Sequence, residues 1–234
     1  MAARTVTSMS PPPMRPICTA MIIDPVFTLN QWFSPNYPLG SFAYSHGMEV
    51  AIQDGRVSSA ATLENWVRDI LEHGTGRSDA ILLHAAYRCV DANAAVELDA
   101  VARAYSPSAE RLMESIQQGD AFCRTTNAIW PVQLPDLCHP VAVGYSAGQL
   151  GLPAVLAAGM YMQAFAANLV SCAVRLVPLG QTEGQMVLHR LASVCSSIGA
   201  ASAKDSLDDL ASSAFAAEIA SMQHETLHHR IFRT

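Results

Sequence analysis

Apolar residues three and four positions apart recur along most of this chain. That spacing places them on one face of an α-helix. No window shows sustained alternation of apolar and polar residues, so the sequence predicts no β-strand. It predicts an all-α fold of about nine to ten helices, without an internal repeat. The clearest apolar stripe is Leu63, Trp66, Val67, Ile70 and Leu71, and others lie within about 41–55, 78–90, 98–105, 106–130, 140–152, 153–177, 187–198 and 206–234.

Several residues are typical of helix ends. Ser106 followed by Pro107 predicts an N-cap with proline at the first helical position. Ser206 with Asp209 three residues later predicts an approximate capping box, from which a last helix would run to the C-terminus. Gly55 is a candidate for the residue that ends the helix leading in from Gly40.

The longest uncharged stretch, residues 137–174, contains no Asp, Glu, Lys or Arg. Its second half, residues 153–177, is long enough to span a bilayer, so a membrane span, a core helix and a buried subunit interface are all open interpretations. Alanine dominates over leucine and isoleucine there, and Gln163 and Asn168 lie near the middle. Small residues allow close approach of neighbouring backbones, which favours a central helix enclosed by other helices.

The N-terminal residues 1–23 form a different region. Residues 1–20 are rich in Ser, Thr and Pro and lack the apolar core of a signal peptide. Their acid-poor, Ser-rich composition leaves a transit peptide as an alternative. We therefore expect a flexible tail over 1–23 and a single helical domain over 24–234.

Composition adds an expectation about partners. Half of the 234 residues are hydrophobic and only 15% are charged, against roughly 25% charged in an average soluble domain. Such a chain has too little charge to cover a monomer, which predicts an obligate oligomer or a subunit of a larger complex. The net charge of −6 and the absence of basic runs argue against nucleic-acid binding. Six scattered cysteines without a CxxC pair indicate reduced, buried thiols in a cytoplasmic protein.

One segment has the pattern of a catalytic motif. His224, Glu225 and His228 fit the HExxH of zinc metalloproteases, in which two histidines on one helical face bind zinc and the glutamate is the general base. Only six residues follow His228, and the one potential ligand among them, His229, points off that face. A solvated helix face is therefore the favoured interpretation. An adventitious or functional metal contact and a zinc hydrolase are the alternatives.

No other nucleophile, nucleotide or metal pattern is found in the sequence. The segment 179–185 contains two glycines but no GK[ST] ending, which indicates a tight connection between helices. Gly144 and Gly148 have the GxxxG spacing that permits close helix packing. We assign no catalytic residue, no metal site and no cofactor.

A family resemblance extends the interpretation. The chain is similar to the urease accessory protein UreF family in four blocks that occur in the family's order. The first block matches the family's SPxxPxGxFxYSxGxE signature. The blocks are residues 34–49, residues 148–153, residues 168–171 with 175–185, and residues 220–226 with 230–233.

What the resemblance implies is an all-α assembly factor without enzymatic activity. Members of this family dimerise, bind the accessory protein UreD (UreH in some organisms) and recruit the GTPase UreG. Together these proteins help to load nickel into apo-urease, with GTP hydrolysed by UreG. The HExxH residues fall inside the family's C-terminal segment, which gives that motif a non-catalytic origin.

The resemblance also suggests partner-binding residues. Aromatic side chains beside an acid in the first block suit a binding hot spot, although packing of the first helix is an equally good interpretation. Arginines in the last block could hold a partner's carboxylate in two hydrogen bonds, or compensate a helix C-terminus. The candidate residues are Phe42, Tyr44, His46, Glu49, Arg230 and Arg233.

Overall fold

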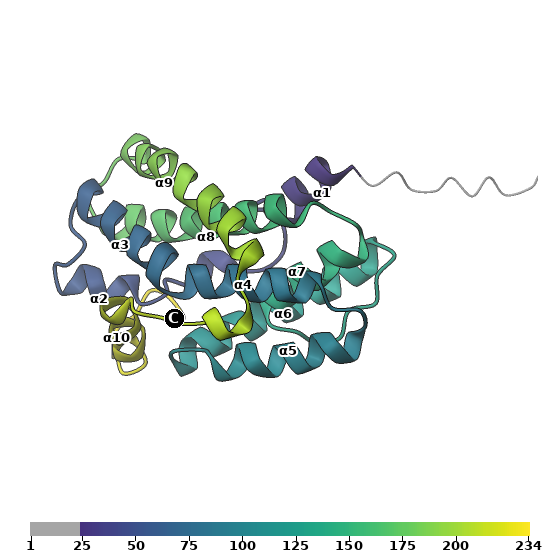
Figure 1. The fold of residues 1–234 in the computed structure, drawn as a ribbon. Helices are drawn as coiled ribbons and strands as arrows, with labels where there is room; N and C mark the ends of the chain where they lie inside the picture. Colours follow the sequence, from purple (N-terminus) through teal and green to yellow (C-terminus); the bar gives the residue numbers. More distant parts are fainter. Residues whose placement is uncertain (1–23) are drawn as a thin grey trace, which may run out of the picture.

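The computed structural model describes residues 24–234. The predicted tail, residues 1–23, lies outside this range, as does Cys18. Within residues 24–234 the chain forms ten α-helices and three short 3-10 helices and no strand, which confirms the all-α prediction (Figure 1). The α-helices are α1 (Pro25–Trp32), α2 (Met48–Gln53), α3 (Ala60–His73), α4 (Thr75–Tyr87), α5 (Ala92–Ala104), α6 (Ala109–Ile129), α7 (His139–Gln149), α8 (Ala154–Leu176), α9 (Gln181–Ala201) and α10 (Phe215–His224), and the 3-10 helices are η1 (Ser41–Ala43), η2 (Ser202–Lys204) and η3 (Leu207–Asp209).

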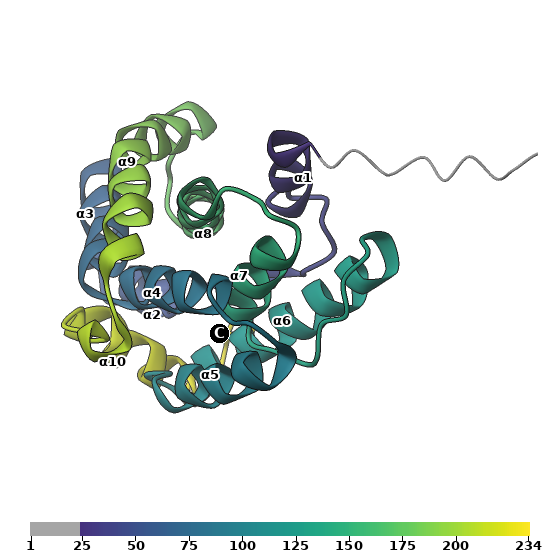
Figure 2. The ribbon, with the colours of Figure 1, turned by 45° about the vertical axis from the view of Figure 1, so that its right-hand side comes forward.

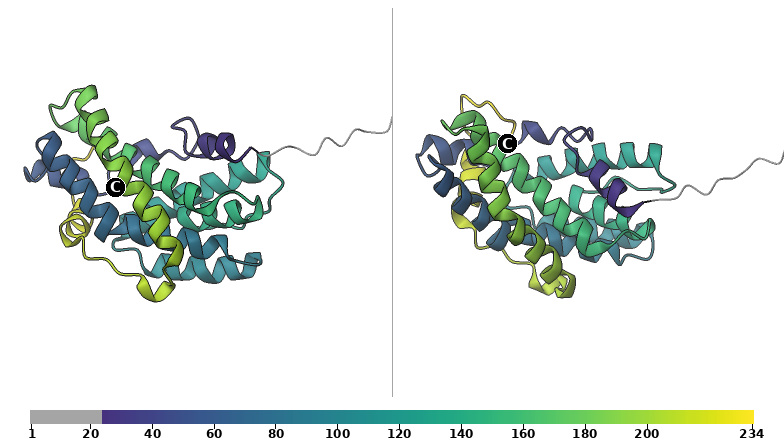
Figure 3. Two further views of the ribbon diagram at one scale, coloured as in Figure 1. Left: turned by 45° about the horizontal axis from the view of Figure 1, so that its top comes forward. Right: turned by 90° about the horizontal axis from the view of Figure 1, so that it is seen from above.

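Helix α8 is the central element. It packs along α9 and also contacts α2, α3, α4 and α7 (Figures 1 and 2). Four of its nine buried residues are alanines, namely Ala157, Ala158, Ala166 and Ala173. Small side chains allow α9 to lie close beside it (Figure 3). A Cβ placed on Gly199 of α9 would lie only 2.7 Å from the Gly159 backbone nitrogen of α8. The predicted central apolar helix is confirmed.

The same helix has a second, more open face. Ala154–Leu176 is long and apolar enough to cross a bilayer by length and composition, and 44% of its most apolar 18-residue window is buried in this fold. Val155 and Leu156 at its N-terminal end are exposed. The neighbouring helices thus enclose about half of α8.

Two glycines of α7 allow close contact with α4. A Cβ on Gly144 would lie 2.1 Å from the Leu83 carbonyl oxygen, and one on Gly148 would lie 2.5 Å from that of Tyr87. The two backbones therefore touch at both positions, which confirms that this GxxxG pair permits close helix packing.

The predicted helix starts need two corrections. The N-cap of α6 is Ser108 and not Ser106, because the Ser108 hydroxyl accepts from the Arg111 amide at 3.0 Å. The predicted helix over 41–55 is split into η1 and α2, because His46 and Gly47 both adopt left-handed backbone conformations between them.

The predicted last helix is also wrong in extent. The capping box of Ser206 and Asp209 is present, but it begins only the single turn η3. Residues 210–214 are not helical because their backbone groups form tertiary hydrogen bonds. The Ser213 amide donates to the His73 carbonyl oxygen at 2.7 Å, and the Tyr105 hydroxyl donates to the Leu210 carbonyl oxygen at 2.6 Å. Helix α10 then ends at His224, and residues 225–234 are not helical.

The five cysteines in the described part of the chain are free thiols. Four are buried, as expected from the sequence, and Cys89 is half-buried. Burial raises the pKa of the Cys123 thiol to about 11 and that of Cys172 to about 12. These thiols are therefore unreactive core residues.

Candidate functional site: the signature segment and the C-terminal strap

Residues 34–49, here called the signature segment, cross the surface of α6 and α8. Tyr37 anchors its start: the Tyr37 and Thr126 hydroxyls are hydrogen-bonded at 2.8 Å, and the Tyr37 ring lies 5.7 Å from that of Phe122. Near its end, His46 and Gly47 have φ of +57° and +74°. A Cβ on Gly47 would lie 2.6 Å from the Ser221 backbone nitrogen. Glycine is therefore required there by both conformation and space.

Residues 225–234, here called the strap, run back along the signature segment. The Glu49 carboxylate accepts hydrogen bonds from the Ile231 and Phe232 amides at 3.0 and 3.1 Å. The Arg233 amide donates to the Ala43 carbonyl at 2.8 Å. Further along, the Ser45 amide and hydroxyl both donate to the Thr234 carbonyl oxygen. Two segments about 180 residues apart in sequence thus form one unit.

A buried histidine and two carboxylates fasten the strap at its other end. His224 is completely buried, with Nδ1 2.7 Å from a Glu110 oxygen and Nε2 3.4 Å from a Glu49 oxygen. Arg230 donates to the second Glu110 oxygen at 2.5 Å. Glu110 lies in the first turn of α6, where the helix dipole favours its negative charge.

This geometry corrects the interpretation of the HExxH motif. His224 is the last residue of α10, and His228 follows in a non-helical turn, so the two histidines do not share a helical face. Both ring nitrogens of His224 are already engaged by carboxylates. The expectation of a solvated helix face is also wrong, because His224 lies in the core. The zinc hydrolase alternative has no structural basis here.

The six candidate residues are brought together, but only some of them reach the surface. Phe42 is 67% exposed, and Arg230 and Arg233 are exposed too. The exposure expected for the others is wrong: Tyr44, His46 and Glu49 are each less than 5% exposed. The Tyr44 hydroxyl donates to Gln117 at 2.6 Å, and burial raises the pKa of Tyr44. These three side chains position the segment and the strap.

Residues that the sequence did not indicate as site residues support the site from beneath. Asn168 of α8 donates to the Tyr44 carbonyl at 3.0 Å, which explains a polar residue in the middle of an apolar helix. Glu114 of α6 lies 3.6 Å from His46 and 3.7 Å from Arg111. Glu110 and Glu114 carry no local sequence signal, because their partners lie far away along the chain.

The exposed part of this unit, here called the strap surface, consists of Phe42, Arg175, Arg230, Ile231 and Arg233. Arg175 of α8 lies over the Phe232 ring, 5.1 Å from its centroid, and donates to the Phe42 carbonyl at 3.3 Å. Three arginines and two large apolar side chains are therefore exposed on the signature segment, the strap and the adjoining end of α8. Arginine beside apolar anchors is a combination enriched at protein interfaces.

The exposed side chains of this site, arginines beside large apolar residues, suit contacts with another protein. Among residues 24–234, no three His, Cys, Asp or Glu side chains are placed to hold one metal ion. The fully buried His224 has no access to a substrate. Fold and site together define a class: an all-helical protein in which buried carboxylates fasten a C-terminal strap to a segment beside the central helix.

Comparison with known proteins identifies the family of the chain. The sequence profile of the UreF family matches residues 57–192. The chain is 47% identical over 209 residues to the urease accessory protein UreF of Ruegeria pomeroyi, covering 89% of this chain and 96% of the relative. It is 49% identical over 214 residues to UreF of Roseobacter denitrificans, covering 92% and 96%, and 39% identical over 215 residues to that of Azorhizobium caulinodans, covering 87% and 93%. The chain belongs to the UreF family of urease accessory proteins.

Proposed function

We propose that this chain is a non-catalytic assembly factor that binds UreD/UreH-type and UreG-type accessory proteins and helps to load nickel into apo-urease. In this proposal UreG hydrolyses the GTP, and this subunit positions its partners in the cytoplasm. Family membership supports the general role. The charge-poor composition supports an obligate place in a complex.

The observation that carries the proposal is the exposed strap surface held by buried carboxylates. Glu49 and Glu110 fix the strap backbone and Arg230, so Arg233, Ile231 and Phe42 are presented in a defined arrangement. A rigid surface loses little conformational entropy on binding. Its arginines suit acidic side chains of a partner, to which a guanidinium can make two hydrogen bonds.

The experiment is co-purification of tagged variants with the UreG-type GTPase in the presence of the UreD/UreH-type subunit. We expect Arg233→Ala and Arg230→Ala each to weaken capture of the GTPase by about 30-fold, the loss typical of a hot-spot residue. Deletion of residues 232–234 should abolish capture. Arg88→Ala removes an exposed arginine at the end of α4 and should have no effect. Undiminished capture and urease activation by the three strap variants, with helicity intact, would reject the proposal.

We further propose that the chain forms a homodimer. Large apolar side chains remain exposed on α1, α8 and α10, including Phe27, Leu156 and Phe215. Burying them against a second copy would remove apolar area from water. Sedimentation equilibrium at micromolar concentration should give the dimer mass, and a monomer at every concentration would contradict this.

A further inference from the structure

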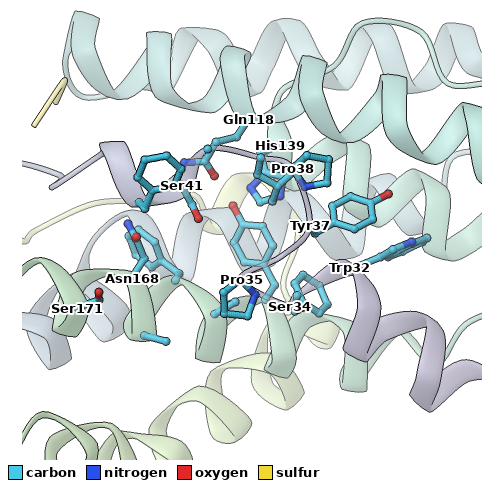
Figure 4. A pocket seen from close by; sticks show the side chains of 18 of the residues that line it. Trp32, Ser34, Pro35, Tyr37, Pro38, Ser41, Gln118, His139, Asn168 and Ser171 are labelled. Carbon is cyan, nitrogen blue, oxygen red and sulfur yellow. The ribbon is translucent and has the colours of Figure 1, made fainter. Parts of the chain in front are cut away.

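A groove with a volume of about 300 Å³ lies between α8 and the first part of the signature segment (Figure 4). Its walls are mainly apolar, and four aromatic rings line it, those of Phe33, Tyr37, Tyr161 and Phe165. In Figure 4, Asn168 and Ser171 of α8 lie on one side of it. Pro35 and Pro38 at its rim are exposed, so the groove is open to solvent.

The α8 side of the groove follows one face of the helix. Four residues line it at intervals of three or four positions, namely Tyr161, Ala164, Asn168 and Ser171. At about 1.5 Å per residue, this face is about 15 Å long. An extended chain at about 3.3 Å per residue covers that length with about five residues. The elongated shape therefore matches a short extended segment of polypeptide.

One end of the groove joins the strap surface. Phe42 belongs to both, and Arg175 lies at the same end. The Arg175 guanidinium donates to the Ser171 hydroxyl and to the Phe42 carbonyl oxygen at 3.3 Å each, and both of these residues line the groove. The same guanidinium lies 5.1 Å from the centre of the Phe232 ring in the strap. The groove and the strap surface are therefore continuous.

The charge at this end of the groove is positive. The two charged residues of the lining, Arg111 and Glu114, are buried, and their side chains approach to 3.7 Å, so their charges offset each other. Among residues 24–234, neither Arg175 nor Arg233 forms an ion pair with a carboxylate. Both side chains are exposed. An exposed guanidinium of this kind suits the carboxylate of a binding partner, with which it can form two hydrogen bonds.

We propose that the groove binds an extended, acidic segment of a partner protein, with one aromatic side chain in the groove and a carboxylate on Arg175. Aromatic rings pack well edge-to-face against the rings of the lining. Arg175 reaches back to Ser171, which lies about 9 Å along α8 from Phe165. The aromatic residue and the acid are therefore about three extended residues apart. This inference rests on the proposed function, because it extends the strap surface that contacts the same assembly.

Segments of this chain do not have that chemistry. Residues 1–23 contain two arginines and neither an acid nor an aromatic residue. Within residues 24–234, the exposed aromatic side chains outside the groove are Phe27 on α1, Phe215 on α10 and Tyr105 at the end of α5. None of these three lies in an extended segment, so a second copy of the chain offers no fitting occupant there. The occupant is therefore a different protein.

The first test uses the full-length protein without its partners. The probe is a dye-labelled peptide, Gly-Phe-Gly-Ser-Asp-Glu-Gly, followed by fluorescence anisotropy. We expect saturable binding with a Kd of about 0.1–1 mM, as is reasonable for one anchor and one ion pair. A peptide with Ala in place of Phe should bind at least about ten-fold more weakly, and so should one with Asn and Gln in place of the two acids.

Two variants locate the bound peptide. Ala164→Trp fills the groove from α8, and Arg175→Gln removes the charge at its end. Each should weaken peptide binding by at least about ten-fold. Val155→Trp adds the same bulk at an exposed position of α8 outside the groove, and Arg88→Gln removes an exposed charge from α4. Both controls should leave the Kd unchanged. Thermal melting and hydrogen exchange of the strap establish that each variant keeps its fold.

The second test uses the assembled complex with the urease accessory proteins. The photo-cross-linking residue p-benzoylphenylalanine replaces Pro38 at the rim of the groove, or Val155 as a control. Mass spectrometry then identifies the cross-linked peptides. From position 38 we expect a partner segment that contains an aromatic residue and an acid about three positions apart. Position 155 should not cross-link to that segment.

Several results would overturn the inference. In the first test they are the absence of saturable binding, equal binding of either control peptide, and unchanged binding to both groove variants. In the second test they are cross-links from position 38 only to a second copy of this chain or to residues 1–23, or none at all.

These outcomes are distinct from failure of the proposed function. If the strap variants lose the GTPase while position 38 cross-links to no partner, the proposed function stands and the groove inference is wrong. If the unaltered chain captures none of the accessory proteins, the proposed function is wrong. The peptide titrations then decide the groove inference by themselves, because they need no partner.

Discussion

His139 shows what burial does to a single ionisable residue. It lies at the first turn of α7, where its ring is 5.0 Å from that of Tyr161. Burial is the larger cause, and the nearby Arg111 the smaller, of a pKa lowered to about 3. In the unfolded chain the same imidazole titrates near ~6.5. Between these two pH values the unfolded state binds a proton that the folded state excludes.

This difference predicts how stability depends on pH. Because the unfolded state binds more protons, the free energy of unfolding should fall as the pH falls from about 6.5 towards 3. At pH 5, His139 alone should lower the free energy of unfolding by about 2 kcal/mol relative to its value at pH 8. His139→Gln should remove this difference between the free energies of unfolding that urea denaturation gives at pH 5 and at pH 8. His189→Gln, at an exposed position, should leave the difference unchanged. The same difference in His139→Gln as in the unaltered protein would show that His139 does not cause it.

Glu49 shows how one side chain can organise a distant segment. Its two oxygens accept the Ile231 and Phe232 amides and contact His224. Hydrogen bonds to an ionised acceptor contribute about 1.5–3 kcal/mol, more than neutral ones. Glu49 therefore acts on the strap although it does not reach the surface.

Neutralising this carboxylate should loosen the strap without unfolding the helices. Glu49→Gln loses the charge and places an amide donor against the backbone donors of the strap. We expect hydrogen exchange at Ile231 and Phe232 to become about ten- to hundred-fold faster, with helicity unchanged. Glu97→Gln, on the exposed face of α5, is the matched control. Exchange rates equal to those of the unaltered protein would show that Glu49 does not hold the strap.

At the scale of elements, close contact between helices depends on residues without side chains. Helix α7 meets α4 where Gly144 and Gly148 face carbonyl oxygens, and α8 meets α9 at Gly159 and Gly199. These contacts bring the backbones of two pairs of helices together, and larger residues at Gly144, Gly148 or Gly199 would separate them. The alanine content of α8 has the same physical role.

Two substitutions distinguish a required glycine from a tolerated one. Gly144→Ala places a methyl group 2.1 Å from the Leu83 carbonyl oxygen and should lower the free energy of unfolding by about 1–3 kcal/mol. At Gly159 the nearest atom to an added Cβ is 3.9 Å away. Gly159→Ala should therefore be neutral or stabilising by up to about 1 kcal/mol, because alanine favours helix. Chemical denaturation measures both, and similar losses would contradict the packing argument.

The sequence predicted elements more reliably than their ends. The capping box at Ser206 was correctly identified, yet only one helical turn follows it, because the His73 carbonyl and the Tyr105 hydroxyl take up the backbone groups of residues 210–214. Ser108 replaces Ser106 as a cap for a similar reason: both have hydroxyls, and only the tertiary arrangement selects one. Local signals indicate where a helix can begin, and packing decides how far it extends.

At the scale of the whole molecule, α8 is a core helix with one side open. The helices around it bury 44% of its most apolar window, and its inward alanines fit against α9. A lipid-facing helix is expected to present larger apolar side chains over its length. Gln163 and Asn168 would face an unfavourable environment in hydrocarbon, whereas here Asn168 has a hydrogen-bond partner.

This arrangement predicts the behaviour of the protein towards membranes. After expression and cell lysis, the chain should stay in the supernatant of a carbonate wash, because α8 contacts other helices and not lipid. The same protein fused to an established transmembrane helix provides the control that should pellet. Retention of the unfused chain in the carbonate-resistant pellet would contradict the core assignment.

By itself the sequence determined the all-helical class, the central alanine-rich helix and the family, because helical periodicity, small residues and the four blocks are local properties of the chain. Only the tertiary structure decided the site. It buried Glu49 and His224 and left Phe42 and Arg233 exposed, because the partners of these residues lie more than 100 residues away or on other helices. No local pattern encodes such a contact, since it exists only once the strap has packed against the signature segment.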